Sequence, residues 1–577
     1  MLNKENSMYF DFLVEIPKDT GKISLNRRGG TVYVEYTYGR KYIPEKKYNV
    51  PRRTTIGKLS DQDETMMYPN PNFVKYFPDT ELPEYKDREK RSGCIRIGAY
   101  IVIRKIISEY KLDEMMARII GRDSGLFLDL AAYSIITENN AGQYYPDYGF
   151  NHPLMTPGMR IYSDSKVSEF LAEIPRDRSV GFLNEWNASR NHRERIYISY
   201  DSTNKYCQSG DVEIAEFGHS KDGKDYPIFN YSIAYDHNNR EPLFYEEYSG
   251  SVNDVSQLQI MLGKAKGYGY KKIGFILDRG YFSKANLHFM DKSGYDFIIM
   301  VKGMKKLVRS LILELRGTFE DVPKNSIRKY KVYGTTVKRK MFETDEKERY
   351  FHLYYSSHRH ATEQETFEAH LDRMRAALKK LYRRPVTMDR SYERYFEPIY
   401  YHPGQEDQIF EMVMEKDDVI QEAIRLCGYF CIITSREMTA AEALEIYKSR
   451  DASEKLFRGD KSYLGNSSLR VQTEESFEAK IFIEFVALII RNRMYTCLKD
   501  AVETDEKKAN YMNVPAAIKE LEKIEMIRQN DGEYRLDHAV TAVQKTILRA
   551  FKMDAAYIQK EAARISEVLK GESNGET

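Results

Sequence analysis

The chain has 577 residues, which is too long for one ordinary hydrophobic core, so several domains are expected. Its 89 Lys and Arg nearly cancel its 87 Asp and Glu, and the net charge of +2 neither favours nor excludes nucleic acid as a partner. The longest apolar stretch, Ile481 to Ile490, is interrupted by Glu484 and is too short to cross a bilayer, so no membrane association is expected. The five cysteines form no CxxC pair and the first residues are polar, which favours a reducing cytoplasm without disulfides or a signal peptide.

Residues 1–90 are predicted to be β-rich and basic. The run Val32–Tyr38 is typical of a strand that ends at Gly39. Over residues 1–60, twelve Lys and Arg stand against six Asp and Glu, with tyrosines between them. Such a surface fits the DNA backbone, and it fits a solvated sheet face equally well. The acidic, Pro-rich segment 61–85 is predicted to be a linker.

Residues 91–190 are predicted to be helical, and they carry no candidate catalytic residue. Apolar residues recur at helical spacing from Ile101 and again over Leu126–Ile136. A further short helix is expected at 163–174, with Ser163 or Asp164 as its cap. This region is either a second DNA-contacting module or a packing layer.

The segment 191–302 alternates strands and helices. The predicted elements are strands at 195–201, 226–235 and 241–248, a helix at 253–266, a strand at 271–278, a helix at 283–292 and a strand at 295–301. This order resembles that of a ribonuclease-H-like core, a mixed five-stranded sheet with flanking helices. Two strands end in an acid, Asp201 and Asp278. A strand-end Asp is usually a turn residue or a helix cap, but an uncompensated charge at the mouth of the wholly apolar strand before Asp278 is costly.

The next segment, 303–425, is predicted to leave this core as an inserted basic domain. Over 302–349, fourteen Lys and Arg stand against seven Asp and Glu. A long charged helix is expected at 363–383. The core is predicted to resume over 426–505, first with an apolar strand at 428–434.

That strand leads into a helix-like stretch, 439–461. Thr439 with Glu442 predicts a capping box at its start. The stretch carries a tyrosine, an arginine, an acid and a lysine at gaps of three, four and seven: Tyr447, Arg450, Glu454 and Lys461. At about 100° per residue these gaps return to one helix face. Gly459 is a natural stop, so Lys461 could lie just past the helix. Taken alone, these four residues on one helix face are typical of a solvent-exposed face. The predicted fold, however, would bring Glu454 close to Asp201 and Asp278.

The remainder is predicted to be helical. Residues 477–495 are strongly apolar and are expected in the core. The tail, 506–577, is predicted to hold helices at 514–527 and about 537–551. It could serve as a dimerising segment or resemble a helix-turn-helix.

These motifs together resemble the DDE transposases of bacterial insertion sequences, in the branch marked by a Y-x2-R-x3-E-x6-K signature. The first acid lies in YDST (Asp201), the second in LDRGYF (Asp278), and the segment 218–223 is similar to the loop that follows the first acid in these proteins. The resemblance is strongest over 195–302 and 426–500. It implies that Asp201, Asp278 and Glu454 are catalytic and hold two Mg²⁺ ions, with Mn²⁺ as a substitute, for an in-line displacement at phosphorus.

The resemblance also implies partners. Arg450 and Lys461 would hold a DNA phosphate, and Tyr447 would pack or hydrogen-bond beside it. The expected partners are double-stranded DNA, as terminal inverted repeats and target, and a second copy of the chain. Some relatives stack a flipped base on a tryptophan of the inserted domain, but the single tryptophan here, Trp186, precedes the first acid. Any flipped base would need a Tyr or Phe of the insertion. A nuclease that never joins strands and a non-catalytic DNA-binding descendant are the alternatives.

Overall fold

The computed structural model divides the chain into two compact units, residues 1–90 and 91–577. It describes residues 9–10, 13–19, 21–44, 47–60, 63–78, 80, 91–190, 195–207, 209, 211–217, 226–250, 254–301, 305–342, 345, 347–405, 408–451, 455–456, 464, 468–471, 473–504, 512–529 and 532–574. In this part of the chain no helix is both long and apolar enough to cross a membrane.

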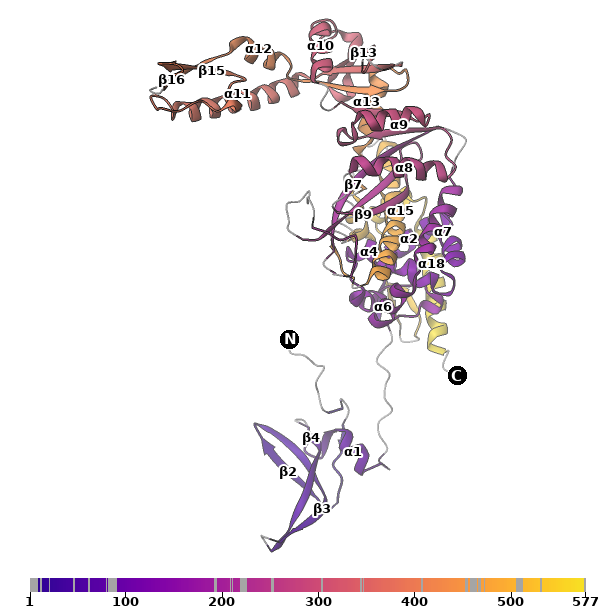
Figure 1. The fold of residues 1–577 in the computed structure, drawn as a ribbon. Helices are drawn as coiled ribbons and strands as arrows, with labels where there is room; N and C mark the ends of the chain where they lie inside the picture. The colour runs from indigo at the N-terminus through magenta and orange to yellow at the C-terminus, as the bar shows by residue number, and fades with distance from the viewer. Residues whose placement is uncertain are drawn as a thin grey trace. The chain divides into compact units, whose positions relative to one another are not determined.

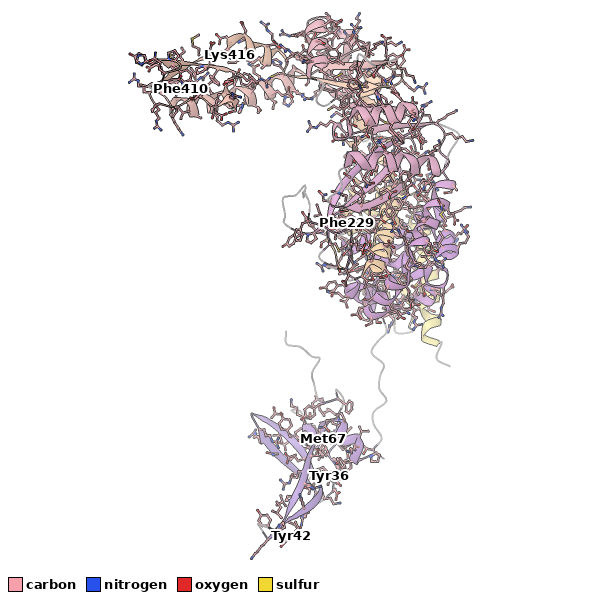
Figure 2. All side chains as sticks on the ribbon, viewed as in Figure 1. Tyr36, Tyr42, Met67, Phe229, Phe410 and Lys416 are labelled. Atoms are coloured by element: carbon pink, nitrogen blue, oxygen red, sulfur yellow. The ribbon has the colours of Figure 1, made fainter. Side chains whose placement is uncertain are left out.

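The first unit is an antiparallel sheet in the order β1-β5-β4-β3-β2. Its elements are β1 (Val14–Glu15), β2 (Ile23–Arg28), β3 (Thr31–Ile43), β4 (Tyr48–Leu59), β5 (Met66–Pro69) and α1 (Pro71–Tyr76). In the described part of this unit, the small core consists of five buried side chains: Val14, Val34, Ile56, Met67 and Phe73. Figure 2 marks Met67 in this unit, and Tyr42 towards the turn of the long β3–β4 hairpin. The predicted β-rich character is confirmed.

Two sequence predictions for this unit were wrong. Gly39 does not end β3 but lies inside it, at a register shift between Thr37 and Gly39, because a glycine within a strand often marks a bulge. The supposed linker begins with β5 and α1 instead. The Asn70 side chain accepts hydrogen bonds from the backbone of Asn72 and Phe73, and Pro71 occupies the first turn, where its missing N–H costs nothing.

Among the described residues, the second unit contains a ten-stranded mixed sheet in the order β12-β13-β14-β17-β11-β10-β7-β8-β9, with β18 also pairing β7. Its strands are β7 (Ile196–Cys207), β8 (Ile228–Asp236), β9 (Glu241–Ser249), β10 (Ile273–Leu277), β11 (Asp296–Met300), β12 (Ser326–Ile327), β13 (Val332–Lys340), β14 (Glu348–Tyr355), β17 (Tyr429–Thr434) and β18 (Ser468–Leu469). The central strands β7, β10 and β11 are parallel, and β7, β8 and β9 are antiparallel.

The predicted order of three strands, helix, strand, helix and strand is confirmed. The two helices are α8 (Asp254–Gly267) and α9 (Lys284–Lys292), and Ser283 caps the second by accepting a hydrogen bond from the backbone of Asn286. Every residue of β10 is buried, as a continuous apolar run predicts for a parallel strand covered on both faces.

Residues 303–425 are not separate from the sheet, in contrast to the prediction. β14 pairs with β17 along six residues and β13 pairs with β14, so this segment occupies the edge that β17 would otherwise expose. Only the later part forms a core of its own. There, α11 (Ser357–Lys379) lies along β15 (Phe396–Tyr401) and β16 (Ile409–Glu415), with α12 (Asp417–Arg425) beside them (Figure 1). α10 (Lys305–Leu315) precedes β12.

The helical regions before and after the sheet share one core. Their elements are β6 (Cys94–Arg96), α2 (Gly98–Glu109), α3 (Leu112–Ile119), α4 (Ser124–Thr137), α5 (Tyr145–Asn151), α6 (Asp164–Glu173), α7 (Arg176–Ala188), α15 (Glu474–Thr504), α16 (Val514–Leu521), β19 (Glu525–Arg528), β20 (Tyr534–Leu536), α17 (Ala542–Ala550) and α18 (Ala555–Asn574). The apolar helix predicted at 477–495 is confirmed as the core of α15. The helix predicted at 514–527 ends at Leu521, since Ile524 and Met526 alternate as in a strand and β19 pairs with β6.

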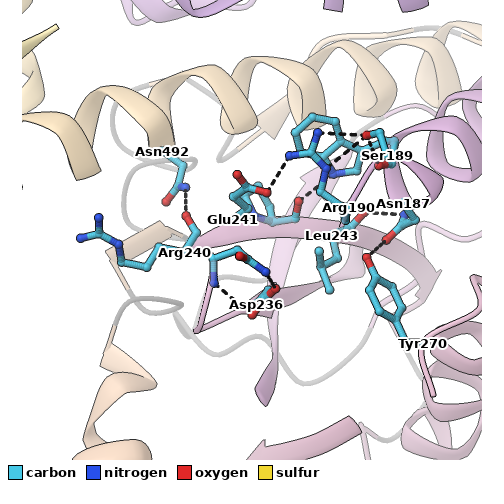
Figure 3. Close-up of polar contacts among 12 residues, drawn as sticks. Asn187, Ser189, Arg190, Asp236, Arg240, Glu241, Leu243, Tyr270 and Asn492 are labelled. Carbon is cyan, nitrogen blue, oxygen red and sulfur yellow. Dashed lines mark hydrogen bonds and ion pairs between the residues drawn. The ribbon is translucent and has the colours of Figure 1, made fainter. Parts of the chain in front are cut away.

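A polar network joins this helical core to the β8–β9 turn (Figure 3). The buried Asn187 amide donates to the carbonyl of Leu243 at 2.9 Å and accepts from the Tyr270 hydroxyl at 2.9 Å. Arg190 donates to Glu241 at 2.8 Å, and Asn492 of α15 donates to the carbonyl of Arg240 at 2.7 Å. These bonds satisfy buried polar groups and hold the antiparallel half of the sheet in place.

Candidate active site

Asp201 lies in β7, and Asp278 directly follows β10, the parallel neighbour of β7. Leu277 is the register partner of Tyr200, and the next residues along the chain are Asp278 and Asp201. Asp201 was predicted to end its strand, but β7 continues to Cys207 because β8 pairs with it as far as Tyr206. On the other side β10 stops at Leu277, and β18 joins only at Tyr206. Among the described residues, the acids therefore lie where β7 has no ladder partner on one side.

Both carboxylates are accessible. The side chains of Asp201 and Asp278 are 20% and 36% exposed. Asp201 accepts a hydrogen bond from the backbone N–H of Ser202 at 2.9 Å.

Arg450 faces both acids. Its Nη1 is 3.7 Å from Oδ2 of Asp201 and 3.6 Å from Oδ1 of Asp278, and its side chain is only 14% exposed. Its guanidinium carbon lies 5.9 Å from the centre of the Tyr447 ring. One cation thus serves two neighbouring carboxylates that would otherwise repel each other.

The helix that carries this arginine is α13 (Ala440–Ser449). The predicted capping box is confirmed: Thr439 accepts from the backbone of Glu442, and Glu442 accepts from the backbone of Thr439. That backbone hydrogen bond from Thr439 lowers the pKa of Glu442. α13 packs on the sheet through Leu444 and Tyr447, which is 6% exposed, in a cluster that includes Ile276 of β10. This packing brings Arg450 over the acids.

α13 ends at Ser449, before the end of the predicted helical stretch, although the described residues Asp451, Lys455 and Leu456 are again helical. Arg450 is its C-cap, and its N–H donates to the carbonyl of Tyr447 at 3.2 Å, as in a tightened last turn. The Ser449 hydroxyl bonds back to Ile446, which competes with continued helix geometry. Glu454 and Lys461 lie outside the described residues, so their predicted places on this face stay predictions.

The acid pair suits a hard divalent cation. Carboxylate oxygens are the ligands that Mg²⁺ prefers, and the Arg450 guanidinium already forms ion pairs with both carboxylates. No group of three His, Cys, Asp or Glu that could hold a metal occurs within the described ranges, from which the third predicted ligand, Glu454, is missing.

The sequence did not reveal that Arg450 faces the two acids. It was predicted to bind phosphate, and no spacing signal links it to Asp201 or Asp278, which are distant along the chain. Tyr447 was likewise predicted to contact DNA, yet most of its ring is used in packing α13 on the sheet. Only its position three residues before Arg450 hints that it lies beside the guanidinium.

Residues 194–490 match the family model of the transposase DDE domain. This match covers more than half of the chain and contains both aspartates and α13, so the chain belongs to the transposase DDE-domain family. No curated protein sequence matches it.

Several solved structures are similar to the chain, including two transposase complexes. One is the piggyBac transposase synaptic complex with hairpin DNA, at 8% identity and a TM-score of 0.33, over 81% of this chain and 82% of that chain. The other is the Mos1 transposase paired-end complex with the left transposon end, at 12% identity and a TM-score of 0.13, over 28% of this chain and 56% of that chain. Because both TM-scores are low, the family assignment rests on the domain match.

Proposed function

We propose that the chain is the transposase of a bacterial insertion sequence, which binds the terminal inverted repeats of its element, cleaves the DNA and joins the ends to a target. The observation that carries this proposal is the register of β7 with β10, which pairs Tyr200 with Leu277 and so brings the following residues, Asp201 and Asp278, together inside the family match. The strand order β9-β8-β7-β10-β11, antiparallel for three strands and then parallel, supports a ribonuclease-H-like core.

In this proposal Asp201, Asp278 and Glu454 hold two Mg²⁺ ions, and Mn²⁺ can replace them. When bound, the ions supply charge stabilisation to the attacking and leaving oxygens of an in-line displacement at phosphorus. The carboxylates stand at fixed positions because β7 and β10 are buried in the sheet. Arg450 and Lys461 hold a DNA phosphate in register, and the Tyr447 ring packs against the Arg450 guanidinium.

The remaining parts extend the proposal to DNA binding. The basic N-terminal sheet and the region 303–425 would contact the element ends, and two copies of the chain would pair them. The six proposed regions are 1–90, 91–190, 191–302, 303–425, 426–505 and 506–577. The proposed setting is the cytoplasm, at the bacterial nucleoid.

A nicking assay tests the assignment. Full-length protein and a labelled duplex with the inverted repeat that brackets its gene are incubated with Mg²⁺, and wild-type protein is expected to cut at the repeat end. Asp201→Asn, Asp278→Asn and Glu454→Gln should each reduce cutting by at least two orders of magnitude while DNA binding remains. Cutting that survives Glu454→Gln would exclude that acid from the triad.

The two alternatives predict different products. A ribonuclease-H-like nuclease would cut but would give no joined product from pre-cut ends and target DNA. A non-catalytic descendant would bind the repeat with or without metal and cut in neither case. The intact acid pair, in β7 and directly after β10, favours the catalytic hypothesis.

A further inference from the structure

Arg450 occupies a position where it can neutralise the acid pair. Its Nη1 is nearly equidistant from the two carboxylates, at 3.7 Å and 3.6 Å, and the group is mostly shielded from solvent. In such a setting two neighbouring carboxylates raise each other's free energy unless a cation compensates them. A guanidinium stays protonated at all physiological pH values, so it can do this without a metal.

We propose that Arg450 exchanges between two anions: it is the counter-ion of Asp201 and Asp278 while they hold no metal, and it moves to a DNA phosphate when they do. The inference rests on the proposed function, because it takes the aspartates as metal ligands. It adds a regulatory step to that function, since Arg450 then remains ion-paired with Asp201 and Asp278 until DNA and metal are both present.

The geometry permits such an exchange. At 3.6 and 3.7 Å these two contacts are ion pairs beyond the length of a direct hydrogen bond, so a closer ligand can displace them. Arg450 is the C-cap of α13, which leaves its long side chain at the end of a firmly packed helix. The buried Tyr447 ring below the guanidinium stays fixed in the cluster with Ile276 and supports the cation in either position.

A thermodynamic consequence follows. A cation that must leave the carboxylates before metal binds lowers the affinity of the free protein for metal. A phosphate that attracts Arg450 removes this competition, so DNA and metal strengthen each other's binding by equal factors. The basal state of the free protein is then one of weak metal binding.

Mn²⁺ binding to full-length protein without DNA tests the competition and requires no catalysis. Titration followed by the loss of the free Mn²⁺ electron paramagnetic resonance signal gives the dissociation constant. Arg450→Ala and Arg450→Gln are expected to bind Mn²⁺ roughly tenfold more tightly than wild type, and Arg450→Lys close to wild type. The matched control is Lys448→Ala, which removes one exposed charge from the same helix and should leave the affinity unchanged.

The outcomes separate this inference from the proposed function. Asp201→Asn and Asp278→Asn should abolish Mn²⁺ binding; if they do not, the proposed metal site itself is wrong. If they do, but Arg450→Ala and Arg450→Gln bind Mn²⁺ no more tightly than wild type, the exchange is wrong and the metal site stands. Adding duplex DNA should tighten Mn²⁺ binding more in wild type than in Arg450→Ala, and equal tightening would overturn the exchange. Fluorescence of the buried Trp186 verifies that each variant is folded.

Discussion

The ammonium group of Lys205 and the carboxylate of Glu484 form an ion pair inside the protein, with 0% and 2% of their side chains exposed. Lys205 belongs to β7, four residues after Asp201, and Glu484 belongs to the middle of α15. The ammonium also lies 4.2 Å from the centre of the Tyr231 ring. This ion pair links α15 to β7, the strand that carries Asp201.

We expect Lys205→Met to lower the free energy of unfolding by about 3–5 kcal/mol, because it leaves the Glu484 carboxylate buried without a cation. The double variant Lys205→Met with Glu484→Leu should recover most of this loss, since it removes both charges. Urea unfolding followed by Trp186 fluorescence measures both. A double variant as unstable as the single one would show that the pair does not act as a unit.

Gly98 is expected to tolerate no side chain. It begins α2, and a Cβ there would lie well inside contact distance of the carbonyl oxygen of Leu521. Gly98→Ala should therefore push α16 away from α2 and lower the free energy of unfolding by about 1–3 kcal/mol. Thermal unfolding measures the loss.

The control for this change is Gly181→Ala. Gly181 lies inside α7, and nothing lies within 4 Å of its added Cβ. The substitution should stabilise the protein by up to about 1 kcal/mol, because alanine favours the helix interior. If both glycine variants shift the unfolding midpoint in the same direction, close packing at Gly98 is not the cause.

The burial of His352 is expected to make the protein less stable in acid. It is fully buried between Thr336 and Thr434, whose hydroxyl oxygens lie 2.9 Å from its two ring nitrogens. Burial lowers its pKa from 6.5 to about 4. Between these values the unfolded chain binds a proton that the folded protein excludes. The free energy of unfolding therefore falls as the pH drops from 6.5 to 4, by about 1.4 kcal/mol per pH unit from this residue.

Urea unfolding of wild type and His352→Gln at several pH values between 7 and 4 checks this prediction. The variant should lose stability less steeply below pH 6.5, since glutamine does not titrate and can still bond to both threonines. Parallel curves for the two proteins would show that His352 is not the group responsible.

The cap of α13 is expected to matter for stability. Thr439→Ala removes the oxygen that accepts from the Glu442 backbone at 3.2 Å, and it should cost about 1 kcal/mol. Thr439→Ser retains the hydroxyl and should cost much less. Chemical unfolding distinguishes the two, and equal losses would mean that the methyl group, rather than the cap, contributes the stability.

Trp186 is expected to take no part in DNA binding. It is fully buried, and its indole N–H donates to the carbonyl of Pro242 at 3.0 Å. Adding duplex DNA should leave its emission maximum unchanged, and Trp186→Phe should retain cleavage. A flipped base would instead need an exposed aromatic of the insertion, and in the described part of 303–425 this is Tyr401, at 58% exposure. Tyr401→Ala should then slow only a step that passes through a DNA hairpin.

Local patterns in the sequence determined much of the central fold. The apolar run before Asp278 predicted a buried strand, the two runs at 226–235 and 241–248 predicted strands, and Thr439 with Glu442 predicted a capped helix start. These features depend on residues close together in the chain, so their spacing is enough to predict them. The family resemblance pointed to the same class as the domain match over 194–490.

Tertiary structure alone decided which distant residues meet. Whether β7 ends at Asp201 depends on β8, and whether 303–425 leaves the core depends on the open edge of β17, because a strand ends or continues according to the partner beside it. In the sequence, Glu484 only interrupts an apolar helix. The tertiary structure shows that it forms an ion pair with Lys205. Likewise, Arg450 became a cation shared by Asp201 and Asp278 only when the sheet and α13 packed together, since electrostatic attraction depends on distance in space.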